Sequence, residues 1–215
     1  MGAYYSAVRS SANLVLGLLS GREVRGIENI PRTGALIVAS NHLSFWDPPL
    51  VGSAVPREAY YLAKEELFET PVLGWMIRSV HSIPIRRGSA DLRGLSRAIA
   101  ILKRGKTLVM FPEGSRMKDG ELHPARPGLG LLAVQADATI VPCYISGSNR
   151  PRRWLMRRTR VRLWFGAARH WRQLVGTESD LEPGRQLYQR VGESVMREIA
   201  SLKSGQEASA SRGAA

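Results

Sequence analysis

The residues with the clearest capacity for chemistry lie in the segment Asn41-His42-Leu43-Ser44-Phe45-Trp46-Asp47, which holds an imidazole, a hydroxyl and a carboxylate. A carboxylate that orients a histidine and stabilises its charged form makes the histidine a general base. The alternative is an Asp47 that caps a helix beside a hydrogen-bonded surface histidine. Five positions apart, His42 and Asp47 point to opposite faces of a strand and diverge by about 140° on a helix. They meet only across a turn, and the segment alone does not decide between the two interpretations.

The flanking sequence supplies such a turn. Residues 35–39 form a short apolar run after Gly34, which is typical of a buried strand. Downstream, Pro48 and Pro49 suit the first turn of a helix, with Asp47 as its N-cap. We therefore expect the polar segment where a strand ends and a helix begins, which is where α/β folds expose reactive groups.

Strand-like and helix-like stretches alternate along the whole chain. The expected strands are 22–30 (with a turn), 36–39, 59–63, 82–85, 107–111, 139–145 and 161–165, the last at a sheet edge. The expected helices are 3–20, 49–55, 64–68, 71–80, 90–104, 129–136 and 181–202. This alternation predicts an α/β fold with a mixed, largely parallel sheet flanked by helices, preceded by an N-terminal amphipathic helix.

The ends of the chain differ in character from its middle. Residues 1–20 combine tyrosines, one arginine and a leucine patch, which suits a helix in the headgroup region of a membrane. The alternative for this helix is docking on the protein's own core. Residues 21–202 are expected to form one domain, and the small, polar residues 203–215 a disordered tail.

Composition narrows the partners and the compartment. The formal net charge is +13, and the stretch Arg150–Arg172 carries nine arginines and no acid, which favours phosphate-bearing partners such as anionic lipid, phosphorylated small molecules or nucleic acid. The single cysteine, Cys143, excludes an internal disulfide framework and is expected to be a core residue. We find no run of ~18 apolar residues and no secretory signal. The expected location is the cytoplasm or the cytoplasmic face of a membrane.

Two further polar clusters follow expected strands. Arg86-Arg87 comes after 82–85, and Glu113-Gly114-Ser115-Arg116 comes after 107–111. Carboxyl ends of parallel strands share one edge of a sheet, so both clusters can converge on His42. The glycine permits close backbone approach to a ligand, and guanidinium groups suit a phosphate. Neither a Walker A sequence nor a GxGxxG motif is present, so nucleotide binding of those types is not expected.

Four short blocks, taken in order, resemble the glycerolipid acyltransferases, the family of 1-acylglycerol-3-phosphate acyltransferases. The blocks are Asn41-His42 with Asp47, Ile83-Pro84-Ile85-Arg86-Arg87-Gly88, Phe111-Pro112-Glu113-Gly114-Ser115-Arg116 and Ile140-Val141-Pro142. The resemblance covers residues 22 to 150, and its specificity comes from the order of the blocks rather than from any one of them. Ser115 replaces the threonine more common in the family and keeps the hydroxyl.

The resemblance implies a mechanism. His42 would be the general base that takes the proton from an acceptor hydroxyl, and Asp47 would hold the imidazole tautomer and stabilise the imidazolium. The acceptor would attack the thioester carbonyl directly, so no covalent acyl-enzyme forms; Ser44 as a nucleophile is the minor alternative. No metal or cofactor is required. A zinc site from His42, Asp47, Glu113 and His123 can be drawn, but no HExxH-like spacing supports it.

The resemblance also implies an acceptor site. Glu113, Gly114, Ser115 and Arg116 would build it, and Arg116 with Arg86 or Arg87 would hold a glycerol phosphate. Lys64 matches a family lysine near the phosphate or oxyanion, or else is an exposed lysine at a helix start, and Arg126 occupies a position that is often basic. The implied activity is transfer of a fatty acyl group from acyl-CoA or acyl carrier protein to a lysophospholipid, with 1-acylglycerol 3-phosphate as the leading acceptor. Glycerol 3-phosphate or another lysolipid is the alternative.

The partners follow from the same interpretation. Anionic membrane lipids are the expected partners of the arginine-rich stretch, since each basic residue near an anionic surface contributes ~1 kcal/mol. We therefore place the protein peripherally on the cytoplasmic face of the membrane. A non-catalytic basic protein that binds anionic membrane or nucleic acid, with Trp154, Trp164 and Trp171 for base stacking, is the alternative from another class. It leaves the four ordered blocks unexplained.

Overall fold

The structure is a computed structural model that describes residues 3–86, 91–156, 158–176 and 182–212. Arg87, one of the expected phosphate ligands, lies outside this part of the chain. Within it, one sheet of eight strands has the order β1-β7-β6-β2-β5-β3-β4, and β8 pairs with β6. The strands are β1 (Glu23–Arg25), β2 (Leu36–Ser40), β3 (Ala59–Lys64), β4 (Ser82–Ile85), β5 (Thr107–Met110), β6 (Thr139–Ser146), β7 (Arg162–Phe165) and β8 (Arg169–His170). Only the β6 pairings with β7 and β8 are antiparallel, which confirms the mixed, largely parallel sheet.

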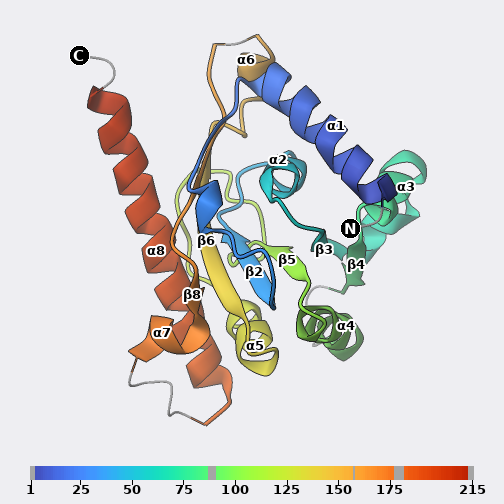
Figure 1. Ribbon diagram of the computed structural model, residues 1–215, viewed down its shortest axis with the longest axis vertical. Helices are drawn as coiled ribbons and strands as arrows, with labels where there is room; N and C mark the ends of the chain where they lie inside the picture. Colours follow the sequence, from blue (N-terminus) through green and yellow to red (C-terminus); the bar gives the residue numbers. More distant parts are fainter. Residues whose placement is uncertain (1–2, 87–90, 157, 177–181, 213–215) are drawn as a thin grey trace.

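Helices cover both faces of this sheet (Figure 1). They are α1 (Ala3–Ser20), α2 (Asp47–Ala54), α3 (Pro71–Ser79), α4 (Leu92–Lys103), α5 (Gly128–Gln135), α6 (Pro151–Leu155), α7 (Trp171–Val175) and α8 (Arg185–Arg212), with 3-10 turns η1 (Ile27–Asn29) and η2 (Glu65–Glu69). Helices α4, α5, α7 and α8 lie on one side, and α1 and α2 lie on the other.

The central strand β2 connects the two cores. Its side chains alternate between faces, as the pleat of a strand requires. Ile37 and Ala39 pack in the core beneath α4, α5 and α8, whereas Leu36 and Val38 pack in the core beneath α1 and α2. All four are completely buried. Burial of each Leu, Ile or Val stabilises the fold by about 1.5–3 kcal/mol, so the end of β2 is a firmly held platform.

Strand β7 is not at the edge of the sheet, contrary to the expectation for residues 161–165. It pairs with β6 on one side and in parallel with β1 on the other, with Glu23 opposite Arg162 and Arg25 opposite Trp164. The edge strand is β1, which is only three residues long. Its pairing depends on a partner about 140 residues further along the chain, which local pattern cannot reveal.

The prediction of a disordered tail is wrong for residues 203–212, because α8 continues to Arg212. The end of this helix is held by the sheet: Gln206 is buried and accepts a hydrogen bond from the Ser146 hydroxyl, and Arg25 donates to the Ser209 hydroxyl at 3.3 Å. Polar side chains that are solvated in an isolated tail thus find fixed partners. Residues 213–215 lie outside the described part of the chain.

Helix α1 forms where it was expected and docks on the protein's own core. Leu16 is buried against the domain, and the Ala59 N–H donates to the Tyr5 hydroxyl at 2.8 Å. On its other side, Leu14 and Leu18 are 63% and 60% exposed. The helix therefore docks on the protein and still presents leucines outward. Among the described helices, we find none with the length and apolar character needed to cross a bilayer.

Candidate active site

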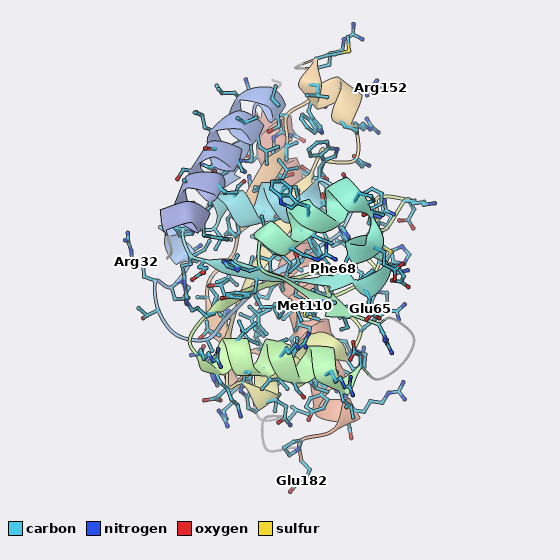
Figure 2. The ribbon with its side chains drawn as sticks, turned by 90° about the vertical axis from the view of Figure 1, so that its right-hand side faces the viewer. Arg32, Glu65, Phe68, Met110, Arg152 and Glu182 are labelled. Atoms are coloured by element: carbon cyan, nitrogen blue, oxygen red, sulfur yellow. The ribbon has the colours of Figure 1, made fainter. Side chains whose placement is uncertain are left out.

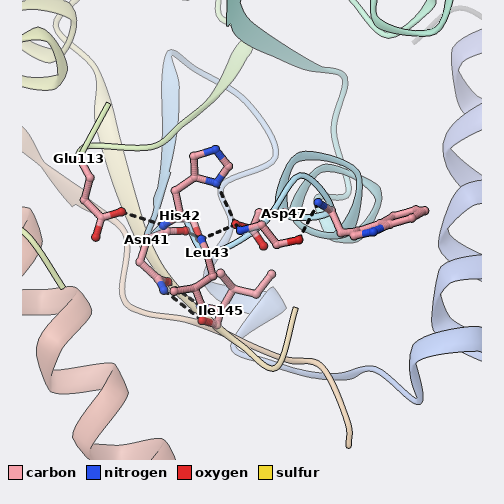
Figure 3. Close-up of polar contacts among 9 residues, drawn as sticks. Asn41, His42, Leu43, Asp47, Glu113 and Ile145 are labelled. Carbon is pink, nitrogen blue, oxygen red and sulfur yellow. Dashed lines mark hydrogen bonds and ion pairs between the residues drawn. The ribbon is translucent and has the colours of Figure 1, made fainter. Parts of the chain in front are cut away.

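The turn between β2 and α2 brings His42 and Asp47 together. The His42 Nδ1 lies 2.8 Å from the Asp47 Oδ2, and the same oxygen accepts the backbone N–H groups of Leu43 at 2.6 Å and Ser44 at 2.7 Å (Figure 3). Asp47 is the first residue of α2, whose N-cap is Trp46, with no capping side-chain bond. The carboxylate thus faces back toward the loop and His42, and the capping interpretation is wrong.

This arrangement sets the tautomer of His42. An ionised carboxylate only accepts hydrogen bonds, so the imidazole carries its proton on Nδ1 and leaves the Nε2 lone pair free. The first turn of α2 adds a favourable field for the Asp47 charge. The Phe111 ring stacks on the imidazole, with centroids 4.1 Å apart, and fixes the plane of the ring. The sequence interpretation named Phe111 as the first residue of the third block but gave it no role in the site.

Glu113 holds the backbone of His42 through a hydrogen bond. Its Oε2 accepts the backbone N–H of His42 at 2.8 Å (Figure 3). Its Oε1 accepts the backbone N–H of His123 at 3.3 Å. Burial raises the pKa of Glu113, while the two backbone N–H groups act in the opposite direction. The Met117 N–H donates to the His42 carbonyl at 2.8 Å. Both backbone groups of His42 are therefore held by the loop after β5, and the carboxylate of Glu113 is turned inward rather than toward a ligand.

Replacing Glu113 by glutamine is expected to destabilise the fold by about 1–3 kcal/mol, because the new amide N–H₂ faces a backbone N–H that then lacks an acceptor. Denaturant unfolding at neutral pH measures this change. The control is Glu121→Gln, which removes an exposed pair with Lys203 and is expected to change stability by less than about 0.5 kcal/mol. Equal midpoints for wild type and Glu113→Gln would contradict the positioning role.

Asn41 ties the end of β2 to β6. Its amide nitrogen donates to the Ile145 carbonyl at 3.0 Å, and its amide oxygen accepts the Ile145 N–H at 2.8 Å (Figure 3). The amide is almost completely buried, so folding removes its hydrogen bonds to water. The two bonds to Ile145 replace them. Its position in the first block was noted from the sequence, but its bridging role was not. It holds the turn that carries His42 in place.

The loop after Glu113, which is bonded to the His42 carbonyl, carries a cation that pairs with none of the described carboxylates. Gly114 has a φ of +72°, and a Cβ there would lie 2.6 Å from the Arg126 Cδ, so glycine lets the Arg126 side chain cross the loop. The Arg126 Nε donates to the Glu113 carbonyl at 3.3 Å. The Arg116 guanidinium lies 3.5 Å from the centroid of the Phe45 ring and pairs with none of the described carboxylates. Arg116 and the Ser115 hydroxyl, which has no hydrogen bond to a described residue, are therefore available to a ligand. The sequence interpretation gave Phe45 no role.

Lys64 and Arg86 reach the same edge of the sheet but do not join this cluster. By register, Arg86 is level with Glu113 and His42, and Lys64 lies one residue earlier. However, β4 lies three strands from β2, which corresponds to roughly 14 Å. Arg86 is already bonded through Nε to Glu65, which raises its pKa, and the Lys64 Nζ lies 3.9 Å from Glu66. Both residues flank the site, and Arg86 must exchange Glu65 for a phosphate in order to bind one.

The arrangement of the described residues does not support three alternative mechanisms. The Ser44 hydroxyl accepts the Trp46 N–H at 3.0 Å and has no bond to His42, so no serine–histidine pair forms. The zinc site considered from the sequence is not formed by its four residues. Glu113 faces backbone N–H groups, and the His123 ring pairs with Asp119 at 2.6 Å. Cys143 is buried, which raises its pKa to about 12 and makes it a core residue rather than a nucleophile.

Among the described residues, this sheet edge presents a histidine that a carboxylate orients, with an unbonded Nε2, and an arginine without an ion pair. Such a site is suited to activate a hydroxyl next to an anionic group. Comparison with known proteins identifies the family to which this chain belongs. Residues 21–146 match the family model described as Acyltransferase, which is more than half of the chain. The chain belongs to this family, and the resemblance drawn from the four blocks is confirmed.

Several relatives are named acyltransferases of lysolipids. The 1-acyl-sn-glycerol-3-phosphate acyltransferase of Bacillus subtilis is 25% identical over 167 residues, which cover 77% of this chain and 82% of that protein. The lyso-ornithine lipid O-acyltransferase of Pseudomonas aeruginosa is 36% identical over 125 residues, 58% of this chain and 47% of the relative. The chain spans only 38% of the chloroplastic 1-acyl-sn-glycerol-3-phosphate acyltransferase BAT2 of Brassica napus.

The fold has a close counterpart among solved structures. The crystal structure of the 1-acyl-sn-glycerophosphate (LPA) acyltransferase PlsC from Thermotoga maritima matches with a TM-score of 0.70 at 27% sequence identity. The match covers 93% of this chain and 79% of that one. The expected fold class is thereby confirmed.

Proposed function

We propose that this protein is an O-acyltransferase that moves a fatty acyl group from a thioester carrier to the hydroxyl of a lysophospholipid, with 1-acylglycerol 3-phosphate as the acceptor. The observation that carries the proposal is the His42–Asp47 pair, whose free Nε2 lies on the same loop cluster as the unpaired Arg116. The family and the names of the Bacillus subtilis and Thermotoga maritima proteins support it.

The reaction follows from the free Nε2. The acceptor hydroxyl donates a hydrogen bond to Nε2, and its proton moves there as the oxygen attacks the thioester carbonyl carbon. The carbon–sulfur bond of the tetrahedral intermediate then breaks, and the thiolate leaves and takes the proton back from the imidazolium. Asp47 stabilises the imidazolium between the two steps. No residue is acylated, in agreement with the hydrogen bonding of Ser44.

The identity of the acceptor is tested by a direct comparison of three candidate acceptors. Arg116 and Lys64 suit a phosphate, which 1-acylglycerol 3-phosphate and glycerol 3-phosphate carry, whereas the 36% identity to a lyso-ornithine lipid acyltransferase favours a second candidate acceptor. The purified protein is assayed by thiol release with each of the three acceptors. We expect the highest kcat/KM with 1-acylglycerol 3-phosphate. A preference for lyso-ornithine lipid would overturn this acceptor, and turnover of none of them would overturn the activity.

We also propose that the protein acts peripherally on the cytoplasmic face of a membrane. Helix α1, with its outward-facing leucines, contacts α6. Helix α6 and the residue after it contribute the exposed Leu155 and Met156, together with Arg152 and Arg153. Apolar side chains beside cations suit an anionic bilayer surface. Figure 1 shows α1 running up to α6 at one end of the molecule.

The double variant Leu14→Gln/Leu18→Gln is expected to bind anionic phosphatidylglycerol vesicles at least about tenfold more weakly, because two apolar side chains lose their transfer from water. Vesicle flotation measures the bound fraction. The control is Leu92→Gln, an equally exposed leucine on α4, which covers the opposite face of the sheet. Unchanged flotation of the α1 variant, or equal loss in the control, would contradict docking through α1.

A further inference from the structure

The arginine-rich stretch after β6 plays no part in the site described above. Four of its arginines, Arg150, Arg158, Arg160 and Arg162, line a pocket of about 580 Å³ together with Leu43 and Ser146. We call this the arginine pocket. It lies on the β6 and β7 side of His42, whereas Lys64 and Arg86 lie on the β3 and β4 side.

The positive charge of the arginine pocket is largely uncompensated. Arg150, Arg158 and Arg160 form no ion pair with any carboxylate in the described ranges. The Arg162 Nε lies 3.4 Å from Glu23, a residue that also pairs with Arg25. No acidic residue lines the pocket. Guanidinium groups gathered around one hollow repel one another unless an anion lies between them, so the lining favours a ligand with more than one negative charge.

The backbone beneath these arginines is firmly held. Gly147 has a φ of +80°, and a Cβ at this position would lie 2.4 Å from the Arg160 carbonyl oxygen. Glycine therefore lets the loop after β6 approach the segment before β7. The Val161 carbonyl accepts the Glu23 N–H at 2.9 Å, and the Val161 N–H donates to the Ser20 carbonyl at 3.3 Å. Arg160 and Arg162 thus extend from a segment bonded to both α1 and β1.

The arginine pocket shares a wall with the catalytic turn. Leu43, which lines it, follows His42 directly and donates to Asp47. The Asn41–Ile145 bonds hold this turn against the end of β6, one residue before Ser146 of the lining. Strand β7 lies two strands from β2, or roughly 10 Å. A group bound in the pocket is therefore close to His42 without occupying the space in front of it.

We propose that the arginine pocket binds the phosphate groups of a nucleotide-type thioester carrier, coenzyme A. The proposal rests on the proposed function, since it assigns the donor of that reaction. Both substrates are anionic, and each needs cations of its own. Arg116 serves the acceptor, and the four arginines on the other side serve the donor. The pantetheine arm of coenzyme A, when extended, is longer than the two-strand separation, so it can carry the thioester from the pocket to His42.

The shape of the site favours a small polyphosphate over an acidic carrier protein. The volume is within the range of small-molecule sites, and the arginines line one open pocket. Arg152 and Arg153 of α6 are exposed and lie outside the pocket, and Figure 2 shows Arg152 at the end of the molecule, projecting away from the sheet. They provide a matched control with the same change in charge.

Binding of free coenzyme A, measured by isothermal titration calorimetry, tests the assignment without any need for turnover. Wild type and His42→Ala are expected to bind it equally. Arg158→Gln/Arg160→Gln is expected to bind at least about tenfold more weakly, because charge-assisted hydrogen bonds are lost. Arg152→Gln/Arg153→Gln is expected to bind within about twofold of wild type, because it loses only long-range attraction. Unchanged affinity in the pocket variant, or an equal loss in the control, overturns the proposal.

Kinetics then separate this proposal from the proposed function. In the pocket variant, KM for acyl-CoA is expected to rise at least about tenfold, while KM for the acceptor and kcat stay unchanged, because the lost contacts serve donor binding alone. Coenzyme A binding without acyl transfer would refute the function and leave the pocket assignment standing. Normal turnover with an unaltered KM for acyl-CoA, or a defect confined to acyl carrier protein donors, would refute the pocket assignment and leave the function standing.

Discussion

Replacing His42 by alanine is expected to lower kcat by about 10²- to 10⁴-fold, the range for loss of a positioned general base. The His42 Nε2 is the free lone pair that the Asp47 carboxylate orients and that Phe111 holds in plane. The backbone N–H and carbonyl of His42 keep their bonds to Glu113 and Met117, so the variant is expected to fold. Thiol release at saturating donor and acceptor measures the rate, and circular dichroism confirms the fold.

The matched control for His42 is His123→Ala. His123 belongs to the same loop cluster, and its backbone N–H binds Glu113, but its ring is half-exposed and pairs with Asp119. Its loss is a surface change, and we expect activity within about twofold of wild type. Full activity in His42→Ala would refute the mechanism. Equal loss in both variants would instead indicate that they act through a shared ligand such as a metal.

Replacing Asp47 by asparagine is expected to lower kcat by about 10- to 100-fold with little change in KM, because a charge-assisted bond to the imidazolium becomes a neutral one. Three N–H donors converge on Oδ2, from His42, Leu43 and Ser44, so the asparagine oxygen must take that place. The Nδ1 proton of His42 is therefore retained, and Nε2 stays free. Nitrogen NMR of the imidazole is expected to show the wild-type tautomer.

The same substitution places an amide N–H₂ where the buried Asp47 Oδ1 has no hydrogen-bond partner among the described residues. An unsatisfied buried donor costs about 1–3 kcal/mol, so the variant is expected to be less stable as well as slower. The control is Asp119→Asn, which makes the same chemical change at an exposed ion pair with His123. Wild-type kcat in Asp47→Asn, or a kcat that merely follows the unfolded fraction, would contradict the assigned role of the charge.

Features encoded within short windows were well predicted from the sequence. The apolar run before His42, the prolines after Asp47 and the glycines that end helices are local signals, and each corresponds to a strand end, a helix start or a turn in the structure. The pairing of His42 with Asp47 followed from them once a turn joined strand and helix. The four ordered blocks identified the family in the same way, because their residues are spaced by the elements that carry them.

Contacts between distant segments were decided by the tertiary structure alone. Which strand lies at the edge depends on β1 meeting β7, and the length of α8 depends on Gln206 meeting Ser146, 60 residues away in sequence. The capacity of an arginine to bind substrate depends on its neighbours: Arg86 faces Glu65, whereas Arg116 faces only the Phe45 ring among the groups described. No local pattern encodes such pairings, because they arise when the sheet is assembled.

The sequence by itself therefore determined the class of fold and the family, because each is written in residues that are neighbours along the chain. It predicted His42 as the general base only through the resemblance of the four blocks. From the sequence, the arginines after β6 were recognised only as a positively charged stretch without an assigned binding site. The tertiary structure decided that four of them surround one pocket and that Leu43 links this pocket to the catalytic turn. A side chain's direction and its nearest opposite charge are set by packing, and packing joins residues that the sequence keeps apart.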